Sequence, residues 1–350
     1  MISKPGKKIN AGIIGGAGYG GTELIKILLF HQKTDLSFVT SRKYAGTRVS
    51  EVNRFLSGLT ELEFIDPDIE KLPEQPDIIF LATPHGTSMK IVPELIKKMP
   101  GAKIIDLSGD FRLDDPVIYR QYYGKDHTSA GLMGNFVYGL SELNREAIAG
   151  ASYVANPGCF ATGMIFAIYP LFSCGAVEKE ITVVSVTGSS GSGELPKEVT
   201  HHPVRSKNFK SYKVLEHQHL PEIEKFFKGK FPGRDPEIGF VPQSGPFVRG
   251  IYTTVSIYNK NVTEEEIRNA FHRQYEKEKF VRFVESSPEI AAVYASNYVE
   301  VSFVYKKNFI IAMSAIDNLV RGASGQAVQN MNIMFGFDED EGIQFPGMRP

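Results

Sequence analysis

One of the two cysteines in the chain, Cys159, lies where the sequence predicts the start of a helix. Asn156 is a favourable N-cap, and Pro157 suits the first helical position because its missing N–H would have no partner there. Cys159 is therefore expected in the first turn, where backbone N–H groups and the positive end of the helix dipole stabilise a thiolate. A buried, inert thiol is the ordinary alternative for a free cysteine. The position at a helix start favours a nucleophile.

A thiol nucleophile needs an acid–base partner, and His217 and His219 have the best setting for that role because carboxylates flank them. Alternate side chains of an extended segment point to opposite sides, so we expect one histidine to be catalytic and the other supporting. We choose His219 as the catalytic one, because Pro221 rigidifies its approach and Glu222 can orient it. His217 is the alternative. No cluster at metal-ligand spacing accompanies them, so we predict no metal site.

A glycine-rich turn separates an apolar strand over 9–15 from a helix over 22–29. Glycines here let the chain turn tightly and approach a pyrophosphate that faces the helix N-terminus. The spacing is G-x-x-G-x-x-G and not G-x-G-x-x-G, so an ordinary strand-to-helix turn is the alternative. The residues expected to contact a dinucleotide here are Gly15, Gly18, Tyr19, Gly20 and Gly21.

The next predicted strand, 36–40, ends in Ser41, Arg42 and Lys43. An NAD site would place a carboxylate here for the ribose 2′-hydroxyl, whereas a hydroxyl and two cations suit a 2′-phosphate. The sequence therefore favours NADP as the cofactor. An exposed basic strand end is the alternative.

Arg112 and Arg249 are candidate anion clamps, and the small-residue loop 188–193 could cradle a phosphate if it is not simply a mobile loop. For Arg112, bracing its own loop together with Asp110 is an equal alternative. The substrate assignments are Arg112, Glu222, Arg249 and Ser189. The remaining cofactor assignments are Ser190, Gly191, Asn318 and Gly322.

Strands alternate with helices up to about residue 156, which predicts an α/β, Rossmann-type dinucleotide-binding domain with a parallel sheet. Later strands alternate in polarity without a helix after each one, which predicts a second, α+β domain whose sheet is mainly antiparallel and covered on one face. These strands are 181–187, 251–258, 299–305 and 309–316, and they accompany a helix over 263–281, whereas a helix over 326–335 is expected to return to the first domain. The predicted domains are 1–156, an NADP-binding domain completed by 322–350, and 157–321, a catalytic, substrate and oligomerisation domain.

The composition is that of an ordinary globular protein, with 350 residues, 42% hydrophobic residues and a net charge of −1. The chain has no basic surplus for nucleic acid and no apolar run that would predict a signal peptide or membrane span. Two cysteines 15 residues apart, with a helix between them, predict no structural disulfide and suit a reducing cytoplasm. We expect a small-molecule substrate, a homo-oligomer (dimer or tetramer), and neither nucleic acid nor membrane as a partner.

Taken together, these segments resemble the N-acetyl-γ-glutamyl-phosphate reductases of arginine biosynthesis, relatives of aspartate-semialdehyde dehydrogenase. The most specific segment is A-N-P-G-C-F-A-T-G at 155–163, which is similar to the active-site signature of that family. Two positions depart from the family pattern: Gln243 stands where histidine is frequent after a proline, and Glu194 stands where a basic residue is common. Further similar segments are 15–21, 105–112, 138–142, 217–222 and 322–330.

The resemblance implies that Cys159 attacks an acyl phosphate to give a thioester, that NADPH reduces it to a semialdehyde, and that His219 exchanges the protons. An alternative substrate is an N-succinyl or carrier-protein-linked glutamyl or aminoadipyl phosphate, for which the basic segment 201–213 could be a dock. A non-enzymatic NADP-binding sensor is the alternative from another class.

Overall fold

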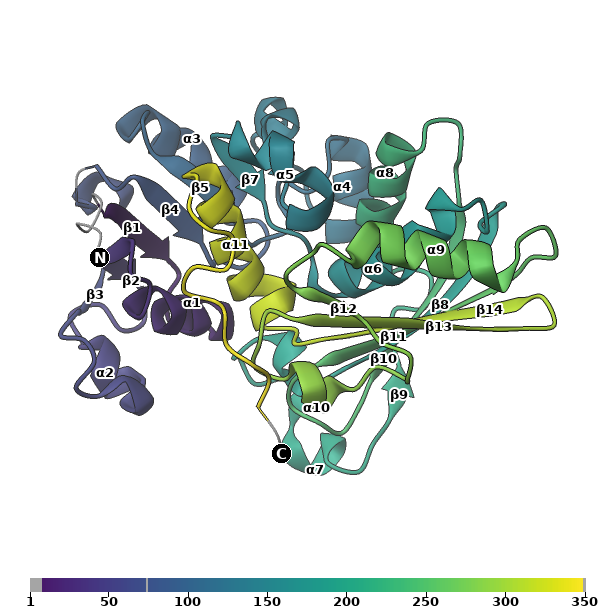
Figure 1. Cartoon of the computed structure of the whole chain (residues 1–350). Helices are drawn as coiled ribbons and strands as arrows, with labels where there is room; N and C mark the ends of the chain where they lie inside the picture. The colour runs from purple at the N-terminus through teal and green to yellow at the C-terminus, as the bar shows by residue number, and fades with distance from the viewer. Residues whose placement is uncertain (1–7, 74, 349–350) are drawn as a thin grey trace, which may run out of the picture. The chain divides into compact units, whose positions relative to one another are not determined.

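The computed structural model describes residues 8–73 and 75–348 (Figure 1). Contacts divide them into two compact units. Unit 1 holds the described residues up to Pro157 and Ala323–Gln344; unit 2 holds Gly158–Gly322 and those from Phe345 onward. The predicted first domain also included the residues from Phe345 onward. No helix among the described residues is long and apolar enough to cross a lipid bilayer.

Unit 1 is built on a seven-stranded parallel sheet in the order β3-β2-β1-β4-β5-β7-β6. Its central strands are apolar runs, as a sheet covered on both faces requires, and all four residues of β4 are buried. The strand order reverses at β1 and β4, the place where such sheets bind ligands. The predicted Rossmann-type fold is confirmed. The strands are β1 Ile9–Ile14, β2 Thr34–Thr40, β3 Phe64–Ile65, β4 Ile78–Leu81, β5 Lys103–Asp106, β6 Val137–Tyr138 and β7 Tyr153–Ala155.

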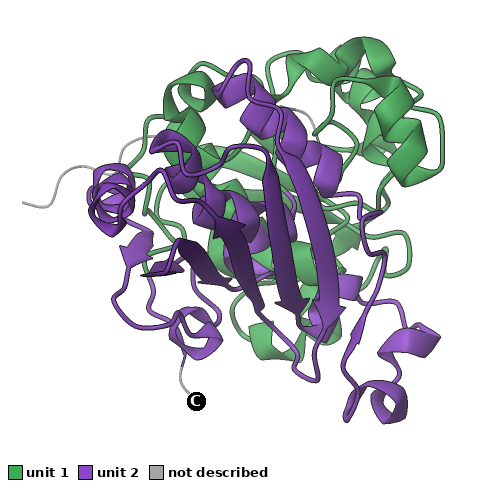
Figure 2. Cartoon of the chain, turned by 90° about the vertical axis from the view of Figure 1, so that its right-hand side faces the viewer, with its two compact units in different colours: residues 1–157, 323–344 green, residues 158–322, 345–350 purple. Residues whose placement is uncertain are grey.

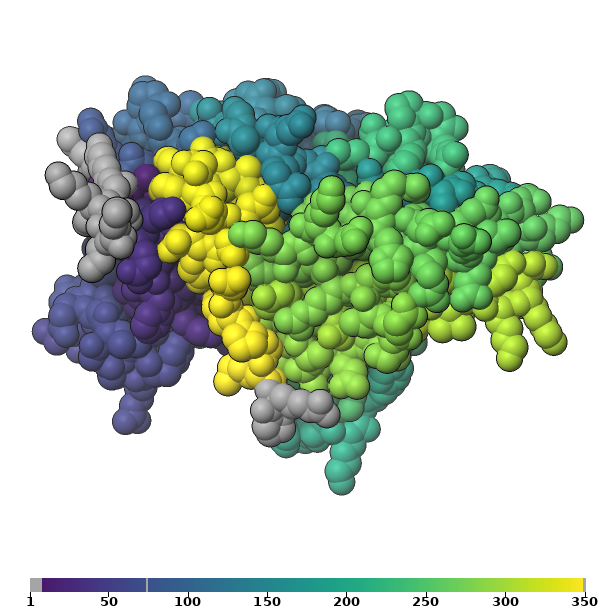
Figure 3. Space-filling model, in the orientation of Figure 1, coloured from purple at the N-terminus to yellow at the C-terminus, as the bar shows by residue number. Residues whose placement is uncertain are grey.

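The last helix of unit 1, α11, is buried along its whole length although several of its side chains are polar. Asn330 accepts a hydrogen bond from Ser141 Oγ at 2.8 Å and donates to Gly139 O at 2.8 Å, so its amide is satisfied inside the unit. Figure 3 shows the C-terminal part of unit 1, in yellow, directly against purple and blue segments from early in the chain. The helices of unit 1 are α1 Tyr19–Leu29, α2 Val49–Val52, α3 Ser88–Lys98, α4 Pro116–Tyr123, α5 Ser141–Ala149 and α11 Gly325–Met334.

Unit 2 contains a mixed seven-stranded sheet in the order β12-β13-β14-β11-β8-β10-β9. Four of its six pairings are antiparallel, which confirms the mainly antiparallel sheet, and two are parallel. The sequence analysis did not predict β10, which contains Pro242, a residue that is rare inside sheets. The strand on the side that the Pro242 nitrogen faces is β9, and β9 pairs only with Gln243 and Ser244 of β10. The missing N–H of Pro242 therefore costs no ladder hydrogen bond. The strands are β8 Glu180–Thr187, β9 Lys210–Ser211, β10 Glu237–Ser244, β11 Ile251–Tyr258, β12 Val281–Phe283, β13 Val299–Lys306 and β14 Phe309–Ile316.

Helix α6 packs on one face of this sheet, where Gly163 lies close to Thr253 of β11 and accepts a hydrogen bond from Ser314 of β14 at 2.7 Å. The opposite face has no helix in front of it in Figure 2. Helix α9 begins with the predicted capping box at Thr263 and Glu266 but ends at Tyr275, not 281, because the chain turns there to add β12 to the sheet. The helices are α6 Cys159–Ser173, α7 His202–Arg205, α8 Leu220–Lys230, α9 Glu264–Tyr275 and α10 Ile290–Val293.

Two carboxylates are buried where β5 ends in unit 1. Asp106 accepts hydrogen bonds from Ser88 Oγ at 2.7 Å and Ser108 Oγ at 2.8 Å, and Asp110 accepts one from the Tyr119 hydroxyl at 2.8 Å. Burial, with the charge of Asp110 as the second cause, raises the pKa of Asp106 from 3.8 to about 6 despite the serine bonds. Ionised Asp106 therefore costs stability.

We expect Asp106→Asn to change how stability depends on pH. The folded pKa of Asp106 lies above its unfolded value, so the wild type loses stability relative to the variant as the pH rises from about 4 to above 6. Over this pH range the stability of the wild type relative to that of the variant should fall by roughly 2–3 kcal/mol. Urea unfolding of both proteins between pH 4 and 7.5 measures it, with the exposed Asp126→Asn as the control. Parallel pH profiles for wild type and Asp106→Asn would contradict the assignment.

Candidate active site

Cys159 lies in the first turn of α6, as expected, but it is the first residue of that helix and the helix is capped differently from the prediction. Gly158 is the N-cap, with φ −69° and ψ 147°, and no side chain caps the helix locally. Asn156 does not cap it, because its side chain donates to Ala323 O at 3.0 Å and accepts from Asn330 Nδ2 at 3.1 Å. The helix therefore begins two residues later than Pro157 suggested.

A carboxylate from another helix satisfies the start of α6. Glu222, in the first turn of α8 and 2% exposed, accepts the hydrogen bond of the Gly158 N–H at 2.7 Å. In a capping box, a glutamate of the same helix binds the N–H of the N-cap residue. Here α8 supplies that glutamate, so the first turns of α6 and α8 are held side by side.

The two histidines lie in one buried cluster, and the prediction that they point to opposite sides was wrong. Residues 217–219 form a turn and not an extended segment, and the two rings are 4.7 Å apart. His217 Nδ1 accepts a hydrogen bond from the His219 N–H at 3.2 Å, which leaves Nε2 to carry the proton of a neutral His217 ring. The Phe160 ring, 5.2 Å from His217 and 6.1 Å from His219, forms an apolar wall beside both.

The imidazole of His219 occupies the space that a side chain at Gly158 would need. A Cβ at Gly158 would lie 2.6 Å from His219 Cδ2 and closer still to Nε2. On another side, a Cβ at Gly322 would lie 2.7 Å from Cys159 Cβ. Both glycines therefore permit close approaches that no other residue allows. One brings His219 against the residue that precedes Cys159, and the other brings a backbone against Cys159 itself.

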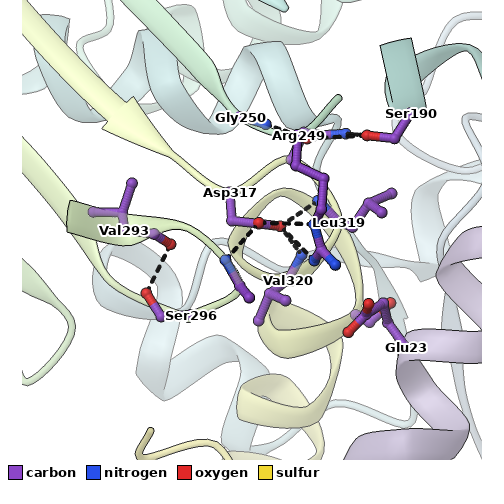
Figure 4. A network of polar contacts seen from close by, with 12 residues as sticks. Glu23, Ser190, Arg249, Gly250, Val293, Ser296, Asp317, Leu319 and Val320 are labelled. Atoms are coloured by element: carbon purple, nitrogen blue, oxygen red, sulfur yellow. Dashed lines mark hydrogen bonds and ion pairs between the residues drawn. The ribbon is translucent and has the colours of Figure 1, made fainter. Parts of the chain in front are cut away.

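Asp317 organises the turn that carries Gly322 (Figure 4). Its fully buried carboxylate accepts two hydrogen bonds from Arg249, at 3.0 and 2.9 Å, and others from the N–H groups of Leu319 at 2.9 Å and Val320 at 2.8 Å. Its carbonyl accepts from the Gly322 N–H at 2.8 Å. The observed contacts of Arg249 are thus structural ones in a bidentate ion pair. Its assignment to the substrate remains a prediction.

The backbone N–H groups of the loop 188–193 already donate to carbonyls of the protein. The N–H groups of Gly188, Ser189 and Ser190 donate to the carbonyls of Gly250, Phe247 and Val248 at 3.0, 2.9 and 3.0 Å. Asn318 joins this arrangement, because its Nδ2 donates to Ser190 Oγ at 2.9 Å and its Oδ1 accepts from Gly250 N at 2.7 Å. An anion bound beside this loop therefore needs side-chain donors. The assignments of Ser189, Ser190, Gly191 and Asn318 to ligands remain predictions.

Tyr212 lies beside the histidine cluster, although the sequence analysis did not select it. Its ring lies 5.9 Å from that of His217. Burial raises the pKa of Tyr212 and the Cys159 charge raises it further, while the Arg205 charge opposes them. The only sequence signal was its place within the basic segment 201–213, a possible dock only under the alternative of a carrier-linked substrate.

In unit 1, the glycine-rich turn fits a dinucleotide pyrophosphate. Gly15 has φ +89°, and a Cβ there would lie 2.7 Å from Ala82 O; one at Gly21 would lie 2.6 Å from Gly15 O. A Cβ at Gly18, the N-cap of α1, would meet no atom within 4 Å, so this side of the helix start is open. Pyrophosphate binding needs a tight turn, a close packing of the backbone and an open helix start, and this segment has all three. Gly20 accepts a hydrogen bond from Ser324 Oγ at 2.8 Å, and Tyr19 is 42% exposed.

The end of β2 presents the predicted basic residues. Ser41 is buried and its hydroxyl accepts a hydrogen bond from Tyr44 N at 3.3 Å, so it shapes the turn. Arg42 and Lys43 are exposed, and Lys43 Nζ lies 4.6 Å from the centre of the Tyr44 ring. The two cations suit a 2′-phosphate, whereas Ser41 is already engaged.

Arg112 braces the backbone of unit 1. Its guanidinium, in a side chain that is 5% exposed overall, donates from Nε to Asn156 O at 2.8 Å and from Nη2 to Leu107 O at 2.9 Å. Of the two alternatives in the sequence analysis, the structure shows the bracing contacts. The assignment of Arg112 to the substrate remains a prediction.

Known protein families match both parts of the chain. Residues 10–151 match the family described as semialdehyde dehydrogenase, NAD binding domain, and residues 159–318 match semialdehyde dehydrogenase, dimerisation domain. The two domains of the chain are those of a semialdehyde dehydrogenase. An N-acetyl-gamma-glutamyl-phosphate reductase of Methanocaldococcus jannaschii is 43% identical over 97% of this chain and 98% of its own, and one of Desulforudis audaxviator is 39% identical over 98% and 100%. The chain belongs to the N-acetyl-gamma-glutamyl-phosphate reductase family.

Solved structures show the same fold at low identity. The aspartate semialdehyde dehydrogenase II of Vibrio cholerae, complexed with ASA, has a TM-score of 0.73 at 16% identity and covers 95% of this chain and 99% of its own. The Candida albicans enzyme with NADP has a TM-score of 0.66 at 13% identity, covering 94% and 99%.

We expect the two cysteines to differ in reactivity. Burial raises the pKa of Cys174, and its thiol donates to Leu171 O at 3.5 Å, so it stays protonated at neutral pH. Cys159, at the start of α6, should react with iodoacetamide at pH 7 at least about tenfold faster. Mass spectrometry of the two labelled peptides measures both rates, and Cys174→Ser should leave the fast phase intact. Equal rates would contradict a nucleophilic Cys159.

Proposed function

We propose that the chain catalyses the NADPH-dependent reduction of N-acetyl-γ-glutamyl phosphate to N-acetylglutamate semialdehyde and phosphate, with Cys159 as nucleophile and His219 as acid–base. The observation that carries this proposal is the placement of Cys159 as the first residue of α6, with the His219 imidazole against the preceding Gly158. Relatives named for this reaction match nearly the whole chain.

The chemistry follows from the groups at the helix start. The Cys159 sulfur attacks the acyl carbon, a C–S bond forms, and the bond to the phosphate oxygen breaks, so phosphate leaves and a thioester remains. Bound NADPH supplies the hydride for this carbon. His219 first takes the thiol proton and then gives a proton to the oxygen of the tetrahedral thiohemiacetal. When that species collapses, the oxygen returns its proton, the aldehyde leaves and the Cys159 thiolate is regenerated.

The surrounding contacts keep the two reacting side chains in place. The Glu222–Gly158 hydrogen bond joins the helix that follows His219 to the helix that begins at Cys159. The Asp317 network holds Gly322 against Cys159. A displacement of about 1 Å in such a site can cost on the order of 10²-fold in rate, so these contacts matter for turnover.

The assay that tests the proposal runs opposite to biosynthesis: phosphate-dependent reduction of NADP⁺ with N-acetylglutamate semialdehyde. N-succinylglutamate semialdehyde and carrier-linked semialdehydes are the comparison substrates. Activity that needs phosphate and prefers the N-acetyl compound supports the proposal. Preference for another acyl group would reassign the substrate, and absence of activity together with an inert Cys159 would favour the NADP-binding sensor.

The two histidines should differ in their effect on turnover. His219→Asn should lower kcat by about 10²–10⁴-fold, the usual contribution of a positioned proton donor and acceptor, without changing cofactor affinity. His217→Asn should mainly raise KM or lower stability, since His217 accepts the His219 N–H bond and packs against Phe160. Steady-state kinetics of both variants decide this.

Gly158→Ala is a third variant for the same test. Its backbone φ of −69° suits alanine, so only the overlap with His219 is introduced, and kcat should fall. Gly134→Ala, where a Cβ meets no atom within 4 Å, is the matched control. A larger kcat loss for His217→Asn than for His219→Asn would reverse the assignment.

For the cofactor, we propose that Gly15, Gly18, Tyr19, Gly20 and Gly21 hold the pyrophosphate and that Arg42 and Lys43 hold the 2′-phosphate. Neutralising Arg42 and Lys43 together should raise KM for NADPH strongly, because each well-formed charge-assisted bond contributes about 1.5–3 kcal/mol. Use of NADH should barely change. The ratio of kcat/KM for NADPH and NADH measures the effect, and an unchanged ratio would mean that the 2′-phosphate binds elsewhere.

We propose that the chain forms a homodimer through the face of the unit 2 sheet that lies opposite α6. On this face, neighbouring strands place Val241, Val184, Thr254 and Met313 in one row, each half-buried in the single chain. A broad apolar sheet face without a covering layer is a typical association surface. The match of unit 2 to a dimerisation domain supports this proposal.

We also propose that the chain works in the cytoplasm. Its two half-buried cysteines are free thiols, which suit a reducing compartment.

Met313→Arg should therefore lower the molar mass in solution to that of one chain. A guanidinium in this row would have to be buried without a partner in the dimer. Light scattering after size exclusion measures the mass, and Glu265→Arg on the exposed side of α9 is the control. Retention of the wild-type mass by Met313→Arg would place the interface elsewhere.

A further inference from the structure

Arg205, the last residue of α7, connects the carboxyl ends of two neighbouring parallel strands in unit 2. Its Nη1 donates to Ser244 Oγ and its Nη2 donates to Thr187 O at 3.2 Å. Ser244 ends β10, Thr187 ends β8, and the two residues face each other in the register of the parallel pair.

No carboxylate neutralises the charge of Arg205 among residues 8–73 and 75–348. Its hydrogen-bond partners are a hydroxyl and a carbonyl, and its buried Nε has no hydrogen-bond partner. Arg249, in the same unit, shows the contrast, because Asp317 pairs with it bidentately. Burial lowers the pKa of Arg205, and no ion pair compensates for it. A half-buried guanidinium with a donor to spare suits a bound anion, for which its planar fork is well shaped.

The surroundings of Arg205 connect it with Cys159. Arg205 and Tyr212 both bind to β10, because Ser244 Oγ accepts from Arg205 Nη1 and Pro242 O accepts from Tyr212 N at 3.0 Å. The Tyr212 ring lies 5.9 Å from that of His217, in the histidine cluster. The N–H groups of the loop that follows Thr187 already donate to carbonyls of the protein. Arg205 therefore supplies the side-chain donor that an anion beside this loop requires.

We infer that Arg205 binds the phosphoryl group of the acyl-phosphate substrate and, in the reverse direction, inorganic phosphate. This inference rests on the proposed function. The phosphoryl oxygen is bonded to the carbon that Cys159 attacks, whereas three carbons separate that carbon from the α-carboxylate of the substrate. Negative charge grows on the phosphate as its bond to that carbon breaks, and a guanidinium already in place stabilises this charge.

The first test measures phosphate dependence in the oxidative direction, with N-acetylglutamate semialdehyde and NADP⁺. Arg205→Gln should raise KM for phosphate by about 10- to 100-fold, and Arg205→Lys by less, while KM for the semialdehyde changes less than about twofold. Lys207→Gln, an exposed neighbour with the same change of charge, should behave as the wild type. Unchanged KM for phosphate in both Arg205 variants overturns the inference. So does a rise in KM for the semialdehyde alone, because Arg205 would then bind the carboxylate.

A second measurement uses only the wild type, in case the variants fold poorly. Phenylglyoxal modifies accessible arginines, and inorganic phosphate should protect Arg205 specifically, as peptide mass spectrometry reads out. Sulfate at equal ionic strength and the modification of Arg234, whose guanidinium donates to Phe172 O, are the controls. Modification of Arg205 at the same rate with and without phosphate overturns the inference. If wild type lacks phosphate-dependent turnover but Arg205 is protected, the proposed function fails and the anion site stands.

Discussion

The hydrogen bond from the Gly158 N–H to Glu222 is the contact on which the arrangement of the site depends. It satisfies the start of a helix that has no local capping side chain, and it does so with a carboxylate from α8. The residue that precedes α8 is His219, so the same bond that closes α6 also brings the imidazole to the helix start. A buried glutamate without this partner would carry a large desolvation cost. Loss of either helix start therefore destabilises the other, and the site is linked to the stability of unit 2.

Glycines at two positions make the close approaches of the site possible. Gly158 leaves its space to His219, and Gly322 leaves its space to Cys159. Neither position requires a positive φ, since Gly158 has φ −69°. What selects glycine here is contact distance and not backbone conformation, in contrast to Gly15 with φ +89°. Only the Gly15 case belongs to a spacing pattern that is recognisable in sequence.

The elements that could be predicted from sequence were those whose signal is local. Strands β11 and β14 have the predicted ends, because alternating β-branched residues and flanking turns define them. The start of α6 and the direction of His217 and His219 were wrong, since both depend on tertiary partners: Asn330 and Ala323 hold Asn156, and a turn replaces the expected extended segment. The roles of the arginines also depend on tertiary partners, which the sequence does not reveal. Sequence placed Arg249 near a ligand but could not show that Asp317 pairs with it, and it gave no reason to separate Arg205 from its basic neighbours.

The burial of α11 has a consequence for how the chain folds as it is made. Unit 1 starts near the N-terminus, yet its interior needs Asn330, whose partners Gly139 and Ser141 lie about 190 residues earlier. Domains near the N-terminus ordinarily fold first during synthesis. Here, until Gly325–Met334 leaves the ribosome, the polar groups that receive α11 have no partner and the surface it covers is open. Unit 2, whose sheet is complete at Ile316, has all its strands before unit 1 can close. The part of the chain synthesised first is thus completed last.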